Sequence, residues 1–485
     1  MKLCCIGHTF YYETEKLCRL FLPFEKIEIV EEFVDDDFLA ITKKEDTCIY
    51  SSLKIGDSFC ECTGNLPSDY NDRDAEREIA GILYKCFTKL TGYEAKWGIV
   101  TGIRPARLYS SVIKELGSEE KAKEFFREKF FVNDEKISLC RETFKAEEDI
   151  IAMSSKNSFS LYVSIPFCPT RCSYCSFVSH AVEKAEKLIP KYVEYLCKEI
   201  IYTAEIAKEL NLRLETVYIG GGTPTTLSAQ QLERVIGLIR SSFDLTYLRE
   251  FTVEAGRPDT ITEEKLSVLK NLMVDRISIN PQTMNDDVLS VIGRAHTTQQ
   301  TVDAFLLARK IGFDNINMDV IAGLPGDNVD SFKDSLMQIG QLKPESVTVH
   351  SLSMKRSSRM NVNGDFPEIE IGKMADEMVM FARSFLTNKG IIPYYMYRQS
   401  KTVGNLENVG YSVKGKECLY NVFIMDETHT ILGCGASAVT KMRQPSGDYI
   451  ERVFNFKYPY EYMDRFDIIL ERKNAIKEFY KKYPI

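Results

Sequence analysis

The sequence of 485 residues lacks any run of about 18 uninterrupted apolar residues, the length that a membrane-spanning helix needs. Its opening segment, Met1–His8, holds too short an apolar run for a secretory signal peptide. Positive charge is also in deficit, because 62 Lys and Arg face 70 Asp and Glu for a formal net charge of −8. No general basic field therefore favours nucleic acid. We expect a cytoplasmic protein with no membrane insertion and no nucleic-acid partner.

The 14 cysteines are neither dense enough nor regular enough for a small disulfide scaffold, which favours a reducing compartment. Eleven of them read most simply as structural thiols. Cys60 and Cys62 form a short pair, but no second pair follows at metal-ligand spacing. We therefore interpret this pair as structural.

The remaining three cysteines, Cys168, Cys172 and Cys175, are spaced C-x3-C-x2-C after a short apolar run. Pro166 and Pro169 remove backbone donors and favour a loop here. Three thiolates on one loop can hold three corners of a 4Fe-4S cluster and leave one iron open for a small-molecule chelate.

Other readings of these three cysteines stay open. A zinc site would typically show paired C-x2-C units with a fourth Cys or His, and His180 is the only histidine close by. Cysteines are also common as small buried hydrophobes, so a chance grouping in a core is possible. A disulfide is a further alternative.

The N-terminal part of the chain indicates an α+β domain over residues 1–155. Short β-rich runs at 26–30, 38–42 and 47–50 predict a small sheet, and helical spacing follows from Asp72. Charged helices over 119–155 then end in a polar linker. We expect a second domain over 156–385 and a third, substrate-covering one over 386–485, where regular strand–helix alternation is lost.

Within residues 156–385, strand-like runs alternate with amphipathic helical stretches. The six candidate strands are 161–165, 216–219, 250–254, 276–280, 316–321 and 346–352. Such repeats imply an α/β fold with a parallel sheet and right-handed crossovers. Six units fall short of a closed eight-stranded barrel, and function is expected at the carboxyl ends of the strands.

Candidate ligand-binding residues stand at these strand ends. The run Gly220, Gly221, Gly222 and Thr223 ends the second strand, and glycines let the backbone approach a ligand closely. Glu254 ends the third strand, where a buried carboxylate needs a cationic or hydroxyl partner. The later candidates are Gln282, Arg294 and Asp319.

The cysteine spacing resembles that of the radical S-adenosylmethionine (SAM) superfamily, and Tyr-x-x-Ile-Pro-Phe-Cys from Tyr162 resembles the oxygen-independent coproporphyrinogen dehydrogenases. The resemblance implies a partial, three-quarter barrel of six βα units. It also implies a 4Fe-4S cluster on Cys168, Cys172 and Cys175, with SAM bound at the open iron. An external low-potential electron donor would drive cleavage of SAM to methionine and a 5′-deoxyadenosyl radical.

The same resemblance assigns roles to individual residues. Tyr162 receives a catalytic role as well as a SAM contact. The implied SAM contacts are Tyr162, Tyr174, Gly220, Gly221, Gly222, Thr223, Glu254, Gln282, Arg294 and Asp319.

Two further segments resemble the HemZ type of this family: the Trp97–Pro105 run, and Tyr397-Arg398-Gln399 followed by Gly-Asn-Leu-Glu-Asn-Val-Gly-Tyr. The aromatic and basic segment at Tyr397 and Arg398 suits a flat anionic macrocycle, a tetrapyrrole. Arg104 and Arg107, beside a proline-initiated helix, could hold carboxylates or could belong to a simple docking loop.

The resemblance implies oxidative decarboxylation of coproporphyrinogen III propionates to the vinyl groups of protoporphyrinogen IX, in porphyrin and heme biosynthesis. Alternatives are methyl transfer to a tetrapyrrole, ring opening of heme, and heme trafficking without catalysis. Two departures stand near the cysteines: Ser164 replaces a histidine of the better characterised dehydrogenases, and Phe177 replaces a further cysteine.

Overall fold

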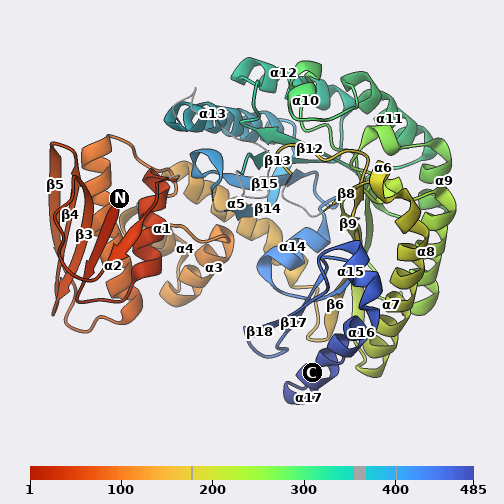
Figure 1. The fold of residues 1–485 in the computed structure, drawn as a ribbon, viewed down its shortest axis with the longest axis horizontal. Coiled ribbons are helices and arrows are strands. Elements are labelled where there is room, and N and C mark those ends of the chain that lie inside the picture. Colours follow the sequence, from red (N-terminus) through yellow and green to blue (C-terminus); the bar gives the residue numbers. More distant parts are fainter. Residues whose placement is uncertain (24, 176–178, 354–367, 400) are drawn as a thin grey trace. The chain divides into compact units, whose positions relative to one another are not determined.

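A computed structural model describes residues 1–23, 25–175, 179–353, 368–399 and 401–485 (Figure 1). Phe177, one of the two departures, lies outside these residues. The chain divides into two compact units. Unit 1 comprises Met1–Phe144 with Arg398–Lys401, and unit 2 comprises Lys145–Tyr397 with Thr402–Ile485.

Unit 1 is built on a five-stranded sheet with the order β2-β1-β3-β4-β5. Its strands are β1 (Lys2–Ile6), β2 (Glu28–Val30), β3 (Phe38–Glu45), β4 (Cys48–Ile55) and β5 (Ser58–Asn65). The three predicted strands are confirmed, and β1 and β5 are additional. β5 was missed because its outward positions and its end are polar, as expected of an edge strand.

The helices of unit 1 are α1 (Tyr11–Phe21), α2 (Asp72–Thr91), α3 (Pro105–Leu116) and α4 (Glu119–Glu128), and α5 (Asp134–Ile151) begins there. The predicted helix from Asp72 is confirmed as α2. Asn71 and Asp74 form a capping box at its start, and Gly92 ends it in a left-handed conformation with φ +66°. Its buried face includes Leu83 and Phe87, which join the core under the sheet.

Unit 2 contains an 11-stranded sheet with the order β14-β15-β13-β12-β11-β10-β9-β6-β16-β17-β18. The six predicted strands are confirmed as neighbouring parallel strands. They are β6 (Ser158–Ile165), β9 (Arg213–Gly221), β10 (Glu250–Glu254), β11 (Arg276–Ser278), β12 (Ile316–Ala322) and β13 (Ser346–Ser351). Apolar and polar residues alternate along these strands, and the polar ones, such as Ser160, Thr252 and Asn317, are buried as well. Burial of both sets fits a sheet covered on both faces.

Helices connect these strands and lie along the outside of the curved sheet in Figure 1. They are α7 (Ile189–Glu209), α8 (Ala229–Ser242), α9 (Glu263–Asn271), α10 (Asp286–Val291), α11 (Thr298–Ile311) and α12 (Val329–Leu342). Ser228 and Thr297 start α8 and α11 with capping boxes, which fixes where each strand-end loop finishes. The loops at the carboxyl ends of the strands are thereby held between rigid elements.

The region expected as a separate third domain instead contributes strands to both edges of this sheet. β15 (Glu407–Ser412) pairs antiparallel with β13, and β16 (Thr430–Cys434) pairs parallel with β6. The remaining elements are α13 (Glu368–Thr387), β14 (Ile392–Arg398), α14 (Leu419–Asp426), β17 (Val439–Arg443), β18 (Ile450–Phe454), α15 (Pro459–Asp464), α16 (Phe466–Lys473) and α17 (Ala475–Lys482). Covering the open edges removes unpaired backbone groups.

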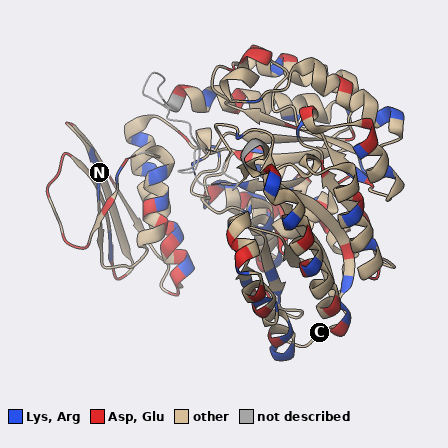
Figure 2. Cartoon of the chain, turned by 45° about the vertical axis from the view of Figure 1, so that its right-hand side comes forward, with Lys and Arg blue, Asp and Glu red and all other residues tan. Residues whose placement is uncertain are grey.

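Among the described residues, no helix has both the length and the apolar character that a membrane crossing requires. Lys and Arg are interspersed with Asp and Glu along the helices in the view of Figure 2.

Candidate functional site

The three motif cysteines stand in the segment that follows the carboxyl end of β6. Cys168 ends the short strand β7 (Phe167–Cys168), which pairs with β8 (His180–Ala181), and Cys172 and Cys175 follow in the loop. Cys172 is buried, whereas the other two thiols are half-buried. The backbone N–H of Ser173 donates to the carbonyl of Ile292 at 3.0 Å. The loop is thus anchored to the chain that follows α10.

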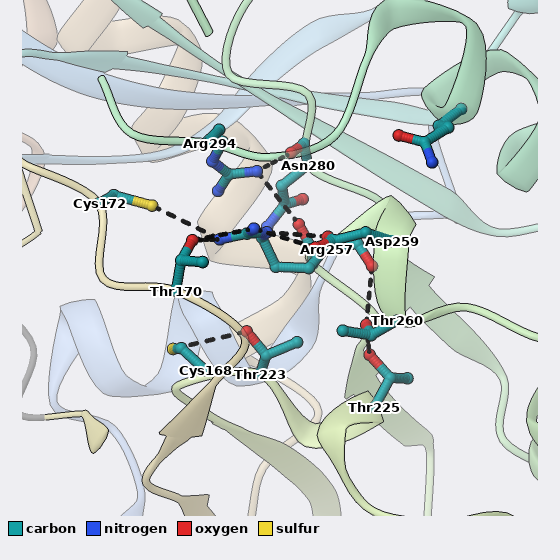
Figure 3. A network of polar contacts seen from close by, with 12 residues as sticks. Cys168, Thr170, Cys172, Thr223, Thr225, Arg257, Asp259, Thr260, Asn280 and Arg294 are labelled. Atoms are coloured by element: carbon teal, nitrogen blue, oxygen red, sulfur yellow. Dashed lines mark hydrogen bonds and ion pairs between the residues drawn. The ribbon is translucent and has the colours of Figure 1, made fainter. Parts of the chain in front are cut away.

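A guanidinium group lies against this loop (Figure 3). Nη1 of the buried Arg257 approaches the Cys172 sulfur at 3.8 Å and donates to the Thr170 hydroxyl at 3.2 Å. Asp259 orients it through two contacts of 3.0 and 3.1 Å. A fixed cation beside this sulfur can offset the negative charge of a metal-bound thiolate. The sequence did not single out Arg257, although it stands three residues after Glu254 in the same strand-end run.

The glycine run shapes the space beside Cys168. A Cβ atom at Gly222 would lie 2.5 Å from the carbonyl oxygen of Phe167 and 3.0 Å from the Cys168 sulfur. Gly221 has φ +105°, which disfavours a side chain there as well. The Thr223 hydroxyl donates to the Cys168 sulfur at 3.6 Å. The predicted glycine segment therefore packs directly on the first cysteine.

Glu254 lies next to this run at the end of β10. A Cβ atom at Gly220 would come within 2.9 Å of its carboxyl carbon, and Tyr218 donates to its Oε1 at 2.5 Å. Burial raises the pKa of Glu254 to about 7. The hydrogen bond from Tyr218 acts to lower this pKa, whereas the negative charge of Asp319 acts to raise it. The carboxyl group is consequently poised to change charge near neutral pH.

Gln282 and Arg294 each carry a buried polar atom without a partner. Gln282 holds a left-handed backbone, φ +69°, and its N–H donates to the carbonyl of Asp319 at 2.9 Å. Arg294 Nη1 donates to the carbonyl of Asn280 at 2.6 Å. Gln282 Oε1 and Arg294 Nε find no hydrogen-bond partner among the described residues. Such atoms can be satisfied by ordered water or by a bound ligand.

Tyr162 belongs to a stack of three tyrosine rings. It lies 6.3 Å from Tyr218 and 6.0 Å from Tyr420 of α14, measured between ring centroids. Tyr420 was not predicted, because no spacing relates it to β6. Burial raises the pKa of Tyr162, so its hydroxyl stays protonated. Tyr174, within the cysteine loop, packs on an apolar cluster that includes Ile292.

Asp319 of β12 is linked through His350 to Tyr397 in the C-terminal part of the chain. Asn317 donates to its Oδ1 at 2.6 Å, and His350 Nε2 lies 3.7 Å from its Oδ2. The other ring nitrogen of His350 is 3.4 Å from the Tyr397 hydroxyl. The pKa of Asp319 lies below its usual value. Burial acts to raise this pKa, but the contacts with His350 and Asn317 outweigh that effect. Asp319 therefore remains a carboxylate.

The predicted arginines lie in unit 1. Arg398 is 3% exposed, donates through Nη1 to the carbonyl of Val100, and stacks 5.2 Å from the ring of Trp97. Arg104 precedes α3 and Arg107 lies in its first turn, both half-buried. Within unit 1, Arg398 thus ties its own short segment to the Trp97 run.

These residues fit the cofactors that the sequence suggested. Three thiols share one loop with a cation beside one sulfur, which suits an iron–sulfur cluster with an open iron. The unpartnered acceptor of Gln282 and donor of Arg294 match an ammonium and a carboxylate, the two charged groups of an amino acid.

Comparison with known proteins agrees with this arrangement. The family model of the Radical SAM superfamily matches residues 162–339. The oxygen-independent coproporphyrinogen-III oxidase-like protein HemZ of Bacillus subtilis (strain 168) is 39% identical over 414 residues, 84% of this chain and 82% of that protein. The heme chaperone HemW of Lactococcus lactis subsp. lactis (strain IL1403) is 41% identical over 196 residues, 40% of this chain and 49% of its own.

Among solved structures, the coproporphyrinogen III oxidase HemN from Escherichia coli, described as a radical SAM enzyme, is similar with a TM-score of 0.51. The two share 22% sequence identity, and the match covers 67% of this chain and 73% of the other. At this level of identity the likeness concerns the fold.

Proposed function

Because this chain belongs to the radical SAM superfamily, in its branch of oxygen-independent coproporphyrinogen-III oxidase-like proteins of the HemZ type, we propose that it decarboxylates coproporphyrinogen III without oxygen. The observation that carries the proposal is the similarity to HemZ, which extends over 84% of the chain and therefore reaches beyond unit 2 into part of unit 1. The products would be protoporphyrinogen IX and carbon dioxide.

The site residues have definite tasks under this proposal. Cys168, Cys172 and Cys175 would hold the cluster, with Arg257 offsetting negative charge at Cys172. When bound, the cluster and SAM would supply the one-electron radical chemistry for removing a hydrogen atom from a propionate side chain, and the decarboxylation would need an electron acceptor. Because Tyr162 keeps its proton, it would serve by packing and hydrogen bonding.

The amino acid part of SAM would meet complementary groups of the chain. The unpartnered Nε of Arg294 would donate to its carboxylate, and the unpartnered Oε1 of Gln282 would accept from its ammonium. Glu254, when ionised, would accept from the ammonium or from a ribose hydroxyl. Each of these contacts is a prediction for the holoenzyme.

For the propionates of the substrate, we propose contacts to Tyr397, Arg398, Arg104 and Arg107. The Tyr397 hydroxyl is already linked through His350 to Asp319. Arg398 also stabilises unit 1 through Val100 and Trp97, so its replacement would mix folding with binding.

The decisive experiment incubates the reconstituted full chain anaerobically with SAM, a low-potential reductant and coproporphyrinogen III. We expect stoichiometric 5′-deoxyadenosine and carbon dioxide, with the vinyl products identified by mass spectrometry. The Cys172→Ala variant is the control and should give neither. Unchanged coproporphyrinogen III in the presence of an intact cluster and SAM cleavage would refute the proposal.

A second candidate, heme trafficking, is favoured by the 41% identity to the heme chaperone HemW over 196 residues. It predicts that the chain binds heme tightly and releases it to an acceptor protein, with no loss of carbon dioxide. Heme titration followed by absorbance, run beside the turnover assay, separates the two functions.

A further inference from the structure

Unit 1 contains a second group of thiols that the proposed reaction does not use. The sulfur atoms of Cys60 and Cys62 in β5 and of Cys86 in α2 all lie within 4.8 Å of one another. All three are free cysteines; Cys86 is buried and the other two are half-buried. From the sequence, Cys60 and Cys62 were interpreted as a structural pair, because the third sulfur comes from Cys86, on a helix distant in the chain.

The fold builds this group from two regular elements. Along β5, Cys60, Cys62 and Gly64 alternate with exposed residues, so all three face α2. At Gly64 a Cβ atom would lie 2.7 Å from Cδ1 of Ile82, so the glycine permits a close approach of the helix. Cys86 follows Ile82 by one helical turn on the same face, which brings it against Cys62.

From this geometry we propose that Cys60, Cys62 and Cys86 bind a thiophilic closed-shell metal ion, such as Zn²⁺ or Cu⁺. Tetrahedral zinc with Zn–S bonds of about 2.3 Å needs sulfurs about 3.8 Å apart, so the thiols must close by about 1 Å or less. Glu61 lies on the opposite, exposed face, where Tyr50 donates to it at 3.0 Å. Sulfur-only ligands select soft ions over Mg²⁺, Ca²⁺ or Mn²⁺.

Three thiolates fill three of the four positions of a tetrahedral ion. Because Cys60 and Cys62 are half-buried on an edge strand, water or a small ligand can reach the fourth position. A disulfide within the strand is disfavoured. Cys60 and Cys62 are two residues apart in an extended strand, which places their Cα atoms about 6.6 Å apart, near the upper limit for a disulfide.

The test uses the full chain with its iron–sulfur cluster already reconstituted, so that Cys168, Cys172 and Cys175 are not available to zinc. The reduced protein is dialysed anaerobically against buffered Zn²⁺, and zinc and iron per chain are measured by mass spectrometry of the metals. We expect one zinc in the wild type and none in Cys60→Ser or Cys62→Ser, with iron unchanged. Cu⁺ replaces Zn²⁺ in a parallel arm.

Cys48→Ser is the matched control, because Cys48 is an exposed thiol of the same sheet outside the group. It should bind zinc like the wild type. Thermal unfolding is the control for misfolding of the variants. Zinc should raise the midpoint temperature of unfolding of the wild type and of Cys48→Ser, but not that of Cys60→Ser or Cys62→Ser. The proposal fails if the wild type binds neither ion, if Cys60→Ser and Cys62→Ser keep full occupancy, or if these variants lose iron.

Discussion

At the scale of single residues, the cysteine loop combines thiols with groups that control their charge. Arg257 reaches the Cys172 sulfur and Thr223 reaches the Cys168 sulfur, each from a different strand end. Burial raises the pKa of Cys168, while Thr223 and Arg257 act in the opposite direction. The neighbouring strands thus supply what a ligand thiolate needs.

Replacing any one of Cys168, Cys172 or Cys175 by alanine should abolish both the cluster and SAM cleavage, because two thiolates cannot hold the cluster firmly. Iron and sulfide per chain, with the absorbance near 400 nm, measure the loss. Cys197→Ala, which removes a buried thiol of α7, should keep iron near the wild-type level. Iron retained in Cys172→Ala would contradict the ligand assignment.

Glu254 should make SAM binding pH-dependent. Its pKa is raised to about 7 by burial, so the group is neutral below that pH and a carboxylate above it. If the carboxylate accepts from SAM, its ionised fraction rises from about a tenth at pH 6 to about nine tenths at pH 8, and affinity rises about tenfold. Calorimetric titration of the cluster-loaded chain measures this.

Glu254→Gln should flatten this pH dependence, and the exposed Glu263→Gln on α9 should retain it. Equal affinities of the wild type at the two pH values would show that the carboxylate does not contact SAM.

At the scale of elements, the glycine run after β9 sets how closely the cysteine loop can approach. Gly222→Ala should lower cluster loading severalfold, because the new methyl group would overlap the Phe167 carbonyl and press on the Cys168 sulfur. Iron per chain after reconstitution is the measurement. Gly237→Ala on α8 meets no atom within 4 Å and should load normally. Equal loading of the two variants would exclude this packing role.

The elements that could be predicted from the sequence are those with a strong local pattern. The alternating apolar residues of β9 and β12 and the helical spacing of α2 can be recognised without tertiary information. β5 is polar on its exposed face, and the strands after β13 are interrupted by loops, so their pairing depends on contacts distant in sequence.

The candidate site divides in the same way. Cys168, Glu254 and Gln282 could be proposed from the sequence because each follows a strand or fits a spacing, and their roles remain predictions. Tyr420 and Cys86 were not, because the first reaches its partners from α14 and the second from a helix packed on β5. Long-range packing decides such positions, and one sequence carries no direct record of it.

At the scale of the whole molecule, the C-terminal residues are part of the unit that carries the cysteines. Their attachment includes a buried ion pair of 3.1 Å between Lys473 of α16 and Glu199 of α7. Glu199 also accepts from the N–H of Gly435 at 2.7 Å, from Asn455 at 2.8 Å and from the Tyr462 hydroxyl at 2.6 Å. One carboxylate thereby joins α7 to the turn after β16, which extends the sheet beside β6.

Removing the positive charge of this network should loosen the C-terminal attachment. Lys473→Met leaves the buried Glu199 carboxylate uncompensated, which should cost about 3–5 kcal/mol of unfolding free energy. Adding Glu199→Gln should recover part of this, because glutamine keeps an acceptor for Tyr462 without the charge. Urea unfolding followed by near-ultraviolet circular dichroism measures both variants. The exposed pair Lys198 and Glu194, 2.8 Å apart on α7, is the matched control: Lys198→Met should leave the free energy of unfolding close to that of the wild type, because solvent screens this pair. If Lys473→Met proves no more destabilising than Lys198→Met, the network does not hold the C-terminal strands in the sheet.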